Sequence, residues 1–246
     1  MLRAIALLKS FTRHRPVHSL SGLCEEHRLS RTTAHRLLAA LESEDLIARD
    51  PVDLSYRLGP GTIALGAQAR LDSDLLTVVQ PELELLASET GETATLEILA
   101  QDQMLILSEV KGRHLVTVAP ETGTMWPLHT TSTGKAILST LSPQRRRELI
   151  PSPLTRFTPS TITGVRAFLR EVEAARDRGY ATASGEIEPG AAAVAVALLD
   201  AQGAARAAIS LGGPVSRLSP DRMKQLGTTL KSRAVSISQR LNTAIH

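Results

Sequence analysis

The sequence predicts an α+β protein in which a small N-terminal winged helix-turn-helix is followed by a larger domain of strands and helices. Three observations indicate this class. Three amphipathic helical segments come first, two short strand-like runs follow them, and the rest of the chain mixes apolar strand-like runs with helices. We therefore expect a winged helix-turn-helix domain at 1–61, a linker helix at 62–74 and a second domain at 75–246.

The composition is that of a globular protein with an aliphatic core. Hydrophobic residues make up 42% of the 246 residues and aromatic residues only 2%, so the core depends on Leu, Val, Ile and Ala. The single cysteine, Cys24, excludes an internal disulfide and a metal site built from several cysteines. No apolar run approaches the roughly 20 residues of a membrane span. We expect a cytoplasmic protein without membrane contact, metal or cofactor.

The first domain is expected to begin with two short helices. Residues 1–11 have Leu2, Ile5 and Leu8 at helical spacing, which predicts that these side chains share one face. Ser19 is of the residue type that caps helix N-termini, because its hydroxyl can accept a bond from a free backbone N–H. It therefore predicts the start of the second helix.

The third helix is the most regular segment of the first domain. A tight break at 27–29 precedes Ser30, which is the expected N-cap of a helix that ends near Ser43. Two strands, 46–49 and 55–58, with a turn at 50–53 between them, are expected to form a β-ribbon after it. One apolar stripe with helical spacing predicts the buried face of the third helix: Ala34, Leu37, Leu38 and Leu41.

The second domain is expected to contain strands, then helices, then strands and a closing helix. A linker helix at 62–71 and a helix from 74 that ends before Gly91 lead into it. The expected elements are strands at 93–100, 104–110 and 114–119, helices from about Thr133, Ser142 and Thr163, a hairpin of 193–200 and 205–213, and a final helix from Ser219.

The face of the third helix opposite its apolar stripe is chemically suited to a major groove of DNA. Arg36 can bond guanine with two hydrogen bonds, Thr32 lies where first-turn groups can meet phosphate, and small Ala39 permits close approach. An ordinary polar surface is the alternative, but the third place in a three-helix unit before a ribbon favours DNA reading. The expected DNA-binding residues are Ser30, Arg31, Thr32, Thr33, His35 and Arg36, with Arg49, Tyr56 and Arg57 of the wing.

Three stretches of the sequence resemble the IclR family of bacterial transcription regulators. They are LSGLCEEHRLSRTTAHRLLAALESEDLIARD with the following YRLGP, then PLHTTSTGKAIL at 127–138, and ISLGGPVSRLSPDR at 209–222. The resemblance implies a GAF-like effector-binding domain, a homo-oligomer (dimer or dimer of dimers) and a pseudo-palindromic operator. Arg28 stands in the helix-turn-helix turn, where the family usually has glycine.

The resemblance also implies where a small effector binds. At Ala183, Ala193 and Gly212 the family commonly has an acidic residue, a cysteine and a serine, so this site is expected to be roomier and more apolar. We expect a ligand with an apolar body and at most one anionic end, from among aromatic acids, aliphatic amino acids and oxo-acids. Small core residues without any ligand are the alternative. The implied effector-binding residues are Ser132, Thr133, Gly134, Ala183, Ala193, Ser210 and Gly212.

Two other function classes fit the residues less well. An enzyme of the hydrolase type would need Ser132, His129 and Glu186 to act together, yet Ser132 lies on no strained nucleophile turn. We therefore expect no catalytic residues. A winged-helix protein-interaction module without ligand control is the remaining alternative, which salt-dependent binding to promoter DNA would exclude.

Overall fold

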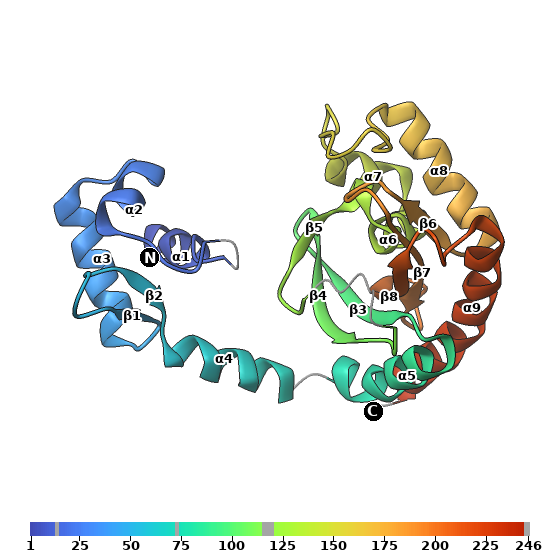
Figure 1. Cartoon of the computed structure of the whole chain (residues 1–246), viewed down its shortest axis with the longest axis horizontal. Coiled ribbons are helices and arrows are strands. Elements are labelled where there is room, and N and C mark those ends of the chain that lie inside the picture. Colours follow the sequence, from blue (N-terminus) through green and yellow to red (C-terminus); the bar gives the residue numbers. More distant parts are fainter. Residues whose placement is uncertain (13–14, 72–73, 115–120, 244–246) are drawn as a thin grey trace. The chain divides into compact units, whose positions relative to one another are not determined.

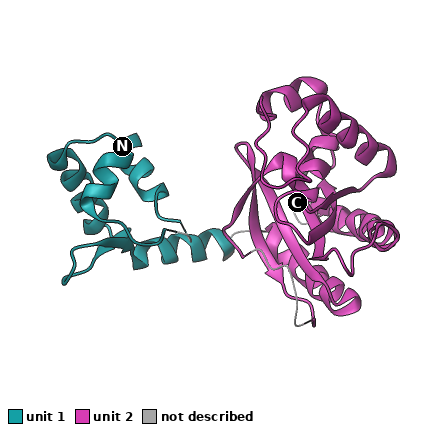
Figure 2. Ribbon diagram, turned by 45° about the horizontal axis from the view of Figure 1, so that its top comes forward, with its two compact units in different colours: residues 1–73 teal, residues 74–246 magenta. Residues whose placement is uncertain are grey.

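The structure is a computed structural model that describes residues 1–12, 15–71, 74–114 and 121–243 (Figure 1). The chain divides into two compact units, 1–73 and 74–246, which Figure 2 colours separately. The strand expected at 114–119 lies, except for its first residue, outside the described residues. Within the described ranges, no helix is both long and apolar enough to cross a membrane.

The smaller unit has the winged helix-turn-helix arrangement that the sequence predicts. Ser19 and Ser30 cap the second and third helices, and their hydroxyls accept hydrogen bonds from the backbone N–H groups of Gly22 and Thr33 at 3.1 and 3.3 Å. The two strands pair antiparallel. In chain order the elements are α1 (Leu2–Lys9), α2 (Leu20–Glu26), α3 (Arg31–Ser43), β1 (Ile47–Arg49), β2 (Tyr56–Leu58) and α4 (Pro60–Leu71).

The first helix is fixed to the core of the smaller unit by one fully buried side chain. Leu2 and Ile5 are 81% and 42% exposed. Leu7 is the fully buried residue of α1, and Leu8 is half-buried beside it. The helix is therefore rotated so that Leu7 packs into the core formed by the buried side chains Leu23, Leu38, Leu41, Ile47 and Tyr56.

The larger unit is a six-stranded antiparallel sheet with helices on both faces (Figures 1 and 2). The strand order is β5-β4-β3-β8-β7-β6. Its elements are α5 (Asp74–Thr90), β3 (Thr93–Ala100), β4 (Gln103–Val110), β5 (Met125–Pro127), the 3-10 turn η1 (Leu128–Thr130), α6 (Ser132–Thr140), α7 (Pro143–Leu149), α8 (Val165–Arg178), β6 (Ala181–Ser184), β7 (Ala191–Leu199), β8 (Ala205–Pro214) and α9 (Pro220–Thr243).

Alternation along the strands divides the core of the larger unit into two layers. Val194, Val196 and Ile209 point to the side covered by α5 and α9. Ala208 packs with residues of α6 and α8 on the opposite side, including Phe168. The centre of the sheet is therefore covered on both sides, and the polar residues Thr95, Glu97 and Ser210 near its centre are buried.

Two expectations for this unit need correction. Strands β5 and β6 were not expected, because each has three or four residues and gains its extended form from pairing at a sheet edge. The expected cap Thr163 does not cap α8: Gly164 is the N-cap and supplies no side-chain bond. The fold class itself, a winged helix-turn-helix followed by an α+β domain, is confirmed.

Candidate DNA-binding face and effector site

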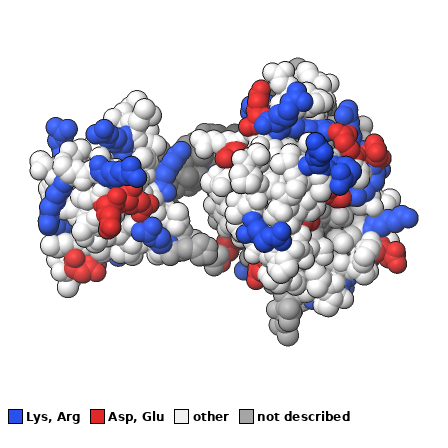
Figure 3. Space-filling view, turned by 90° about the horizontal axis from the view of Figure 1, so that it is seen from above, with Lys and Arg blue, Asp and Glu red and all other residues white. Residues whose placement is uncertain are grey.

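Helix α3 has one packed side and one solvent-facing side. Ala34 and Leu38 are fully buried, whereas the side chains of Thr32, His35 and Arg36 are exposed. Ser30 and Thr33 share a hydrogen bond between their hydroxyls at 2.8 Å, so the first turn is ordered by its own cap. The helix thus presents a guanidinium, an imidazole and hydroxyl groups outward. On the side drawn in Figure 3, each unit carries both basic and acidic side chains.

The expected wing residues differ in how far their side chains are exposed to solvent. Arg57 is exposed, but Arg49 is half-buried with its guanidinium 5.6 Å from the centre of the Tyr56 ring. Tyr56 is only 2% exposed and packs in the core of the smaller unit. Its backbone also exchanges hydrogen bonds with that of His18. The expectation that the Tyr56 ring reaches DNA is therefore wrong, because that ring is a core residue on which Arg49 stacks.

The helix-turn-helix turn shows why glycine suits the position of Arg28. Arg28 has a φ of 51°, in the left-handed region that side chains with a Cβ disfavour. The turn is closed by the N–H of Leu29, which donates to the carbonyl of Cys24 at 2.9 Å. Arg28 therefore adopts the conformation that glycine would take, and the turn is preserved.

Sheet register aligns three of the expected effector residues. Ala183 of β6 is paired with Ala193 of β7, and Ala193 is paired with Gly212 of β8. Directly paired residues of antiparallel strands point to the same face. Ala195, two residues along β7, packs with Ala136 of α6, so this row faces α6. In this row, three neighbouring strands therefore carry only hydrogen or methyl groups on the face toward α6.

A chain of hydrogen bonds links the expected effector residues Ser210 and Thr133. The hydroxyls of Ser210 and Thr95 are 2.7 Å apart, and Thr95 donates to one carboxylate oxygen of Glu97 at 2.9 Å. Thr133 donates to the other oxygen of Glu97 at 2.6 Å. All four side chains are buried. The fold thus brings the start of α6 and the middle of β8 to one polar centre on β3.

Glu97 is the member of this centre that sequence reasoning missed. Burial raises the pKa of the Glu97 carboxyl, and the hydrogen bonds from Thr133 and Thr95 offset only part of that effect. The available signal was a single acidic residue in the middle of the apolar run TATLEILA. The site is therefore less apolar than expected, because it contains a carboxyl group.

The remaining expected residues lie at the start of α6. Thr131 caps this helix by accepting a bond from the N–H of Gly134 at 3.0 Å. Ser132 is buried in the first turn. A Cβ on Gly134 would come within 2.2 Å of the carbonyl oxygen of Leu128, so glycine is required there for close packing of α6 on η1. Gly134 therefore has a packing role that is independent of any ligand.

The hydrogen bonds of Lys135 and His129 do not build the Ser132–His129–Glu186 arrangement that a hydrolase would need. Lys135 donates to Glu186 at 2.5 Å and to the carbonyl of Thr182 at 3.0 Å. His129 is 2.9 Å from the carbonyl oxygen of Thr155 through its Nε2. Glu186 therefore neutralises a lysine and does not orient His129, so the three residues considered for a hydrolase do not form a catalytic chain.

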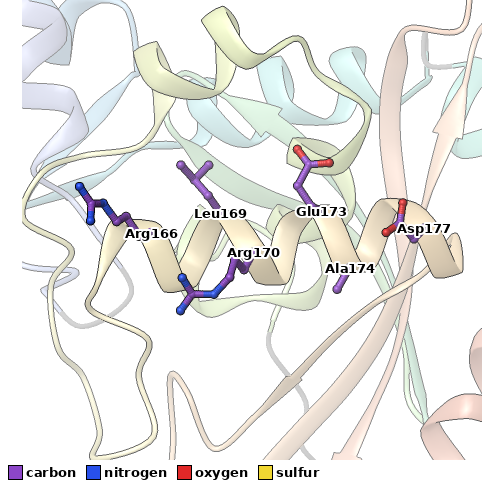
Figure 4. A pocket seen from close by; sticks show the side chains of 6 residues that line it. All are labelled: Arg166, Leu169, Arg170, Glu173, Ala174 and Asp177. Atoms are coloured by element: carbon purple, nitrogen blue, oxygen red, sulfur yellow. The ribbon is translucent and has the colours of Figure 1, made fainter.

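Two surface hollows of the larger unit lie away from the expected effector residues. One is a shallow, open hollow formed by side chains of α8 alone (Figure 4). The other, of about 330 Å³, includes Ala136, Tyr180 and Gly203 in its lining. None of the expected effector residues lines either hollow.

Comparison with known proteins covers almost the whole chain. Residues 2–51 match the IclR helix-turn-helix domain, and residues 68–239 match the bacterial transcriptional regulator IclR C-terminal domain. The HTH-type transcriptional repressor AllR of Escherichia coli K12 is 29% identical over 99% of this chain and 90% of its own length. AllR of Salmonella typhimurium is 30% identical over 97% of this chain and 88% of its own.

Solved structures agree with these matches. An IclR transcriptional regulator of Silicibacter sp. TM1040 has a TM-score of 0.88 and 28% identity, and the match covers 98% of this chain and 95% of that one. An IclR homologue of Microbacterium hydrocarbonoxydans, complexed with 4-hydroxybenzoate, has a TM-score of 0.83 and 26% identity over 98% of each chain.

A winged helix-turn-helix followed by an α+β domain with a buried polar centre defines a class: DNA-binding transcription regulators that respond to a small molecule. The two family matches together leave few residues outside them. The chain belongs to the IclR family of bacterial transcriptional regulators, and it is a DNA-binding regulator of that type with an effector-binding C-terminal domain.

Proposed function

We propose that this chain is an effector-controlled repressor that binds a pseudo-palindromic operator as a dimer or tetramer in the cytoplasm and has no enzymatic role. The observation that carries the proposal is the exposed polar side of α3, opposite the packed side that contains Ala34 and Leu38. Two-fold related copies of α3 would enter successive major grooves about 34 Å apart. The repressor assignment is supported by the AllR relatives, which are named as repressors.

We assign base reading to Arg36 and phosphate contacts to the first turn of α3. Arg36 and His35 are exposed on the solvent side of the helix. Ser30, Arg31, Thr32 and Thr33 surround the helix N-terminus, where backbone dipoles favour a phosphate. Arg57 of the wing is exposed and can meet the backbone, whereas Arg49 contributes mainly by its stacking on Tyr56.

The effector is proposed to bind between the start of α6 and the row of small residues on β6, β7 and β8. Ser132, Thr133 and Ser210 supply hydroxyl groups there, and Ala183, Ala193 and Gly212 leave room for an apolar body. Aromatic acids fit this description best, and the relative that is complexed with 4-hydroxybenzoate supports them. Aliphatic amino acids and oxo-acids remain the other candidates.

Glu97 adds a polarity rule to this effector site. The Glu97 carboxyl accepts hydrogen bonds from Thr133 and Thr95. Unless Glu97 is protonated, its negative charge would repel a ligand carboxylate placed beside it. A ligand hydroxyl or ammonium group would instead be a suitable neighbour. We therefore propose that the effector turns a hydrogen-donating group toward Glu97 and its anionic end, if it has one, away from it.

Ligand control requires two states of the protein with different affinities for the effector. The effector shifts the equilibrium only by that difference, and the same coupling changes operator affinity. We propose that the linker helix α4 (Pro60–Leu71) transmits the change by altering the spacing of the two DNA-binding units.

The test is operator binding by an Arg36→Ala variant. The expected result is a loss of about 1–3 kcal/mol in specific affinity, with unchanged folding and a smaller effect on random DNA. Arg145→Ala on α7 is the matched control, because Arg145 is an exposed arginine of the other unit. Fluorescence anisotropy with the promoter DNA upstream of the gene measures the affinity of both variants.

Unchanged discrimination between promoter and random DNA in Arg36→Ala would refute the assigned face. No salt-dependent DNA binding by the unaltered chain would favour a protein-interaction module.

A further inference from the structure

The hollow on α8 has charges arranged with an internal two-fold symmetry. It is lined by Arg166, Leu169, Arg170, Glu173, Ala174 and Asp177, which Figure 4 shows along one helix. About the point midway between Glu171 and Val172, each lining residue has a counterpart at the same distance on the other side. Arg170 is matched with Glu173, Arg166 with Asp177, and Leu169 with Ala174. The two halves of this face are therefore opposite in charge.

This pattern does not stabilise α8 by itself. Arg166 and Arg170 are four residues apart, as are Glu173 and Asp177, so each pair places like charges side by side on the helix. On this face the basic residues also lie toward the N-terminus and the acidic residues toward the C-terminus, against the helix dipole. These placements are thus unfavourable for the helix, and opposite charges on a partner would offset them.

We propose that this face binds the same face of a second copy of the chain, with the two α8 helices antiparallel. In that arrangement Arg166 meets Asp177 of the other copy and Arg170 meets Glu173, and each contact occurs twice, as two-fold symmetry requires. Leu169 meets Ala174 of the other copy and forms a small apolar seam. The antiparallel helix dipoles add to the attraction. The inference rests on the dimer or tetramer of the proposed function and names the surface through which two copies meet.

One of the acidic residues is already held in position. Arg146 of α7 forms an ion pair with Glu173 and donates to the carbonyls of Leu138 and Ser139 at 2.7 and 3.0 Å. Arg146 is only 2% exposed, whereas the Glu173 side chain remains 52% exposed. The Glu173 carboxylate is therefore fixed at the surface before any partner arrives, which lowers the entropy cost of binding.

The dimensions indicate a weak contact. Helix α8 has 14 residues, so it is about 21 Å long at 1.5 Å per residue. One helix pair of this length buries less than the roughly 1,200 Å² at which stable interfaces begin. Exposed charge pairs are also screened by salt. The α8 contact is thus suited to join subunits or dimers at high local concentration, for example on an operator.

The test uses charge reversal in the full-length chain. Sedimentation velocity over a range of protein concentrations, at low and high NaCl, measures the association constant of Arg166→Asp, of Asp177→Arg and of the double variant that swaps the two charges. We expect each single reversal to weaken the highest-order association at least tenfold at low salt. The double variant should recover most of it, because it restores opposite charges in the same register. Arg222→Asp, at an exposed arginine of α9, is the matched control and should behave as the unaltered chain.

Two results would overturn the proposal. If neither single reversal changes the association, the face binds something other than a second copy. If the double variant stays as weak as the single variants, Arg166 and Asp177 do not face each other across a two-fold axis. Circular dichroism of every variant checks that a loss of association does not come from unfolding.

Discussion

The glycine in the expected effector stretch at 132–134 has a packing role that can be separated from ligand binding. In Gly134→Ala the new Cβ would lie 2.2 Å from the carbonyl oxygen of Leu128 and 2.7 Å from its Cα. Ordinary contacts begin near 3.4 Å, so α6 must move away from η1 by about 1 Å. Overpacking of a fixed core costs about 1–3 kcal/mol, and the better helix propensity of alanine returns about 1 kcal/mol at most. We expect a net loss of about 1–2 kcal/mol in the free energy of unfolding.

Gly212→Ala is the matched control for this loss. A Cβ on Gly212 would have its nearest neighbours at 3.8 Å, which is ordinary van der Waals contact. Both glycines belong to the expected effector set, yet only Gly134 faces an obstructing backbone. Substitution at Gly212 should therefore change the free energy of unfolding by less than about 0.5 kcal/mol.

The assay uses the single tryptophan, Trp126, which lies on β5 and reports only on the larger unit. Urea unfolding of the full chain, followed by Trp126 fluorescence, gives the transition midpoint and its slope for each variant. A loss of about 1–2 kcal/mol corresponds to roughly 2–8 °C in the melting temperature of a unit of this size. Equal stabilities for the two variants would refute the packing argument.

Two further predictions follow from buried carboxylates and use the same fluorescence assay. The pKa of the Glu97 carboxyl is raised above its ordinary value of 4.5 in the folded state. The folded protein is therefore most stable, with respect to this group, below pH 4.5, and that stability is lost as the pH rises through the raised pKa. Between about pH 4 and pH 8, Glu97→Gln should therefore become more stable relative to the unaltered chain. The gain should be about 1.4 kcal/mol for each unit by which the pKa of Glu97 differs between the folded and unfolded states. A difference in stability between the two proteins that does not change with pH would contradict the burial argument. Lys135→Met should cost about 3–5 kcal/mol, because Glu186 loses its buried partner. Adding Glu186→Leu should recover part of that cost, and a further loss in the double variant would contradict this reasoning.

The sequence predicted those elements that carry their own start and stop signals. Ser19, Ser30 and Ser142 each cap the helix expected after them, because a cap depends on a few neighbouring residues. Long strands such as β3 were found at the expected residues, since a short run with β-branched residues between polar turns favours a strand. By contrast, β6 is extended only because β7 pairs with it, and no local pattern encodes that pairing.

The candidate sites were partly predictable for the same reason. Helical periodicity separates the exposed Arg36 from the buried Leu38, so the solvent-facing side of α3 was predicted from spacing alone. The burial of Tyr56 depends on the packing of α1 and α3 around the ribbon, which spacing does not describe. The link from Thr133 through Glu97 to β8 depends on tertiary structure, since it joins segments distant in sequence.

The row formed by Ala183, Ala193 and Gly212 has a consequence for engineering. Each position belongs to a different strand, and each carries at most a methyl group. Serine, cysteine or aspartate can therefore be introduced at one strand at a time, adding one donor or acceptor without removing a core side chain. Since the proposed effector site includes this row, a combinatorial library of these three codons would test whether the row sets the specificity for an inducer.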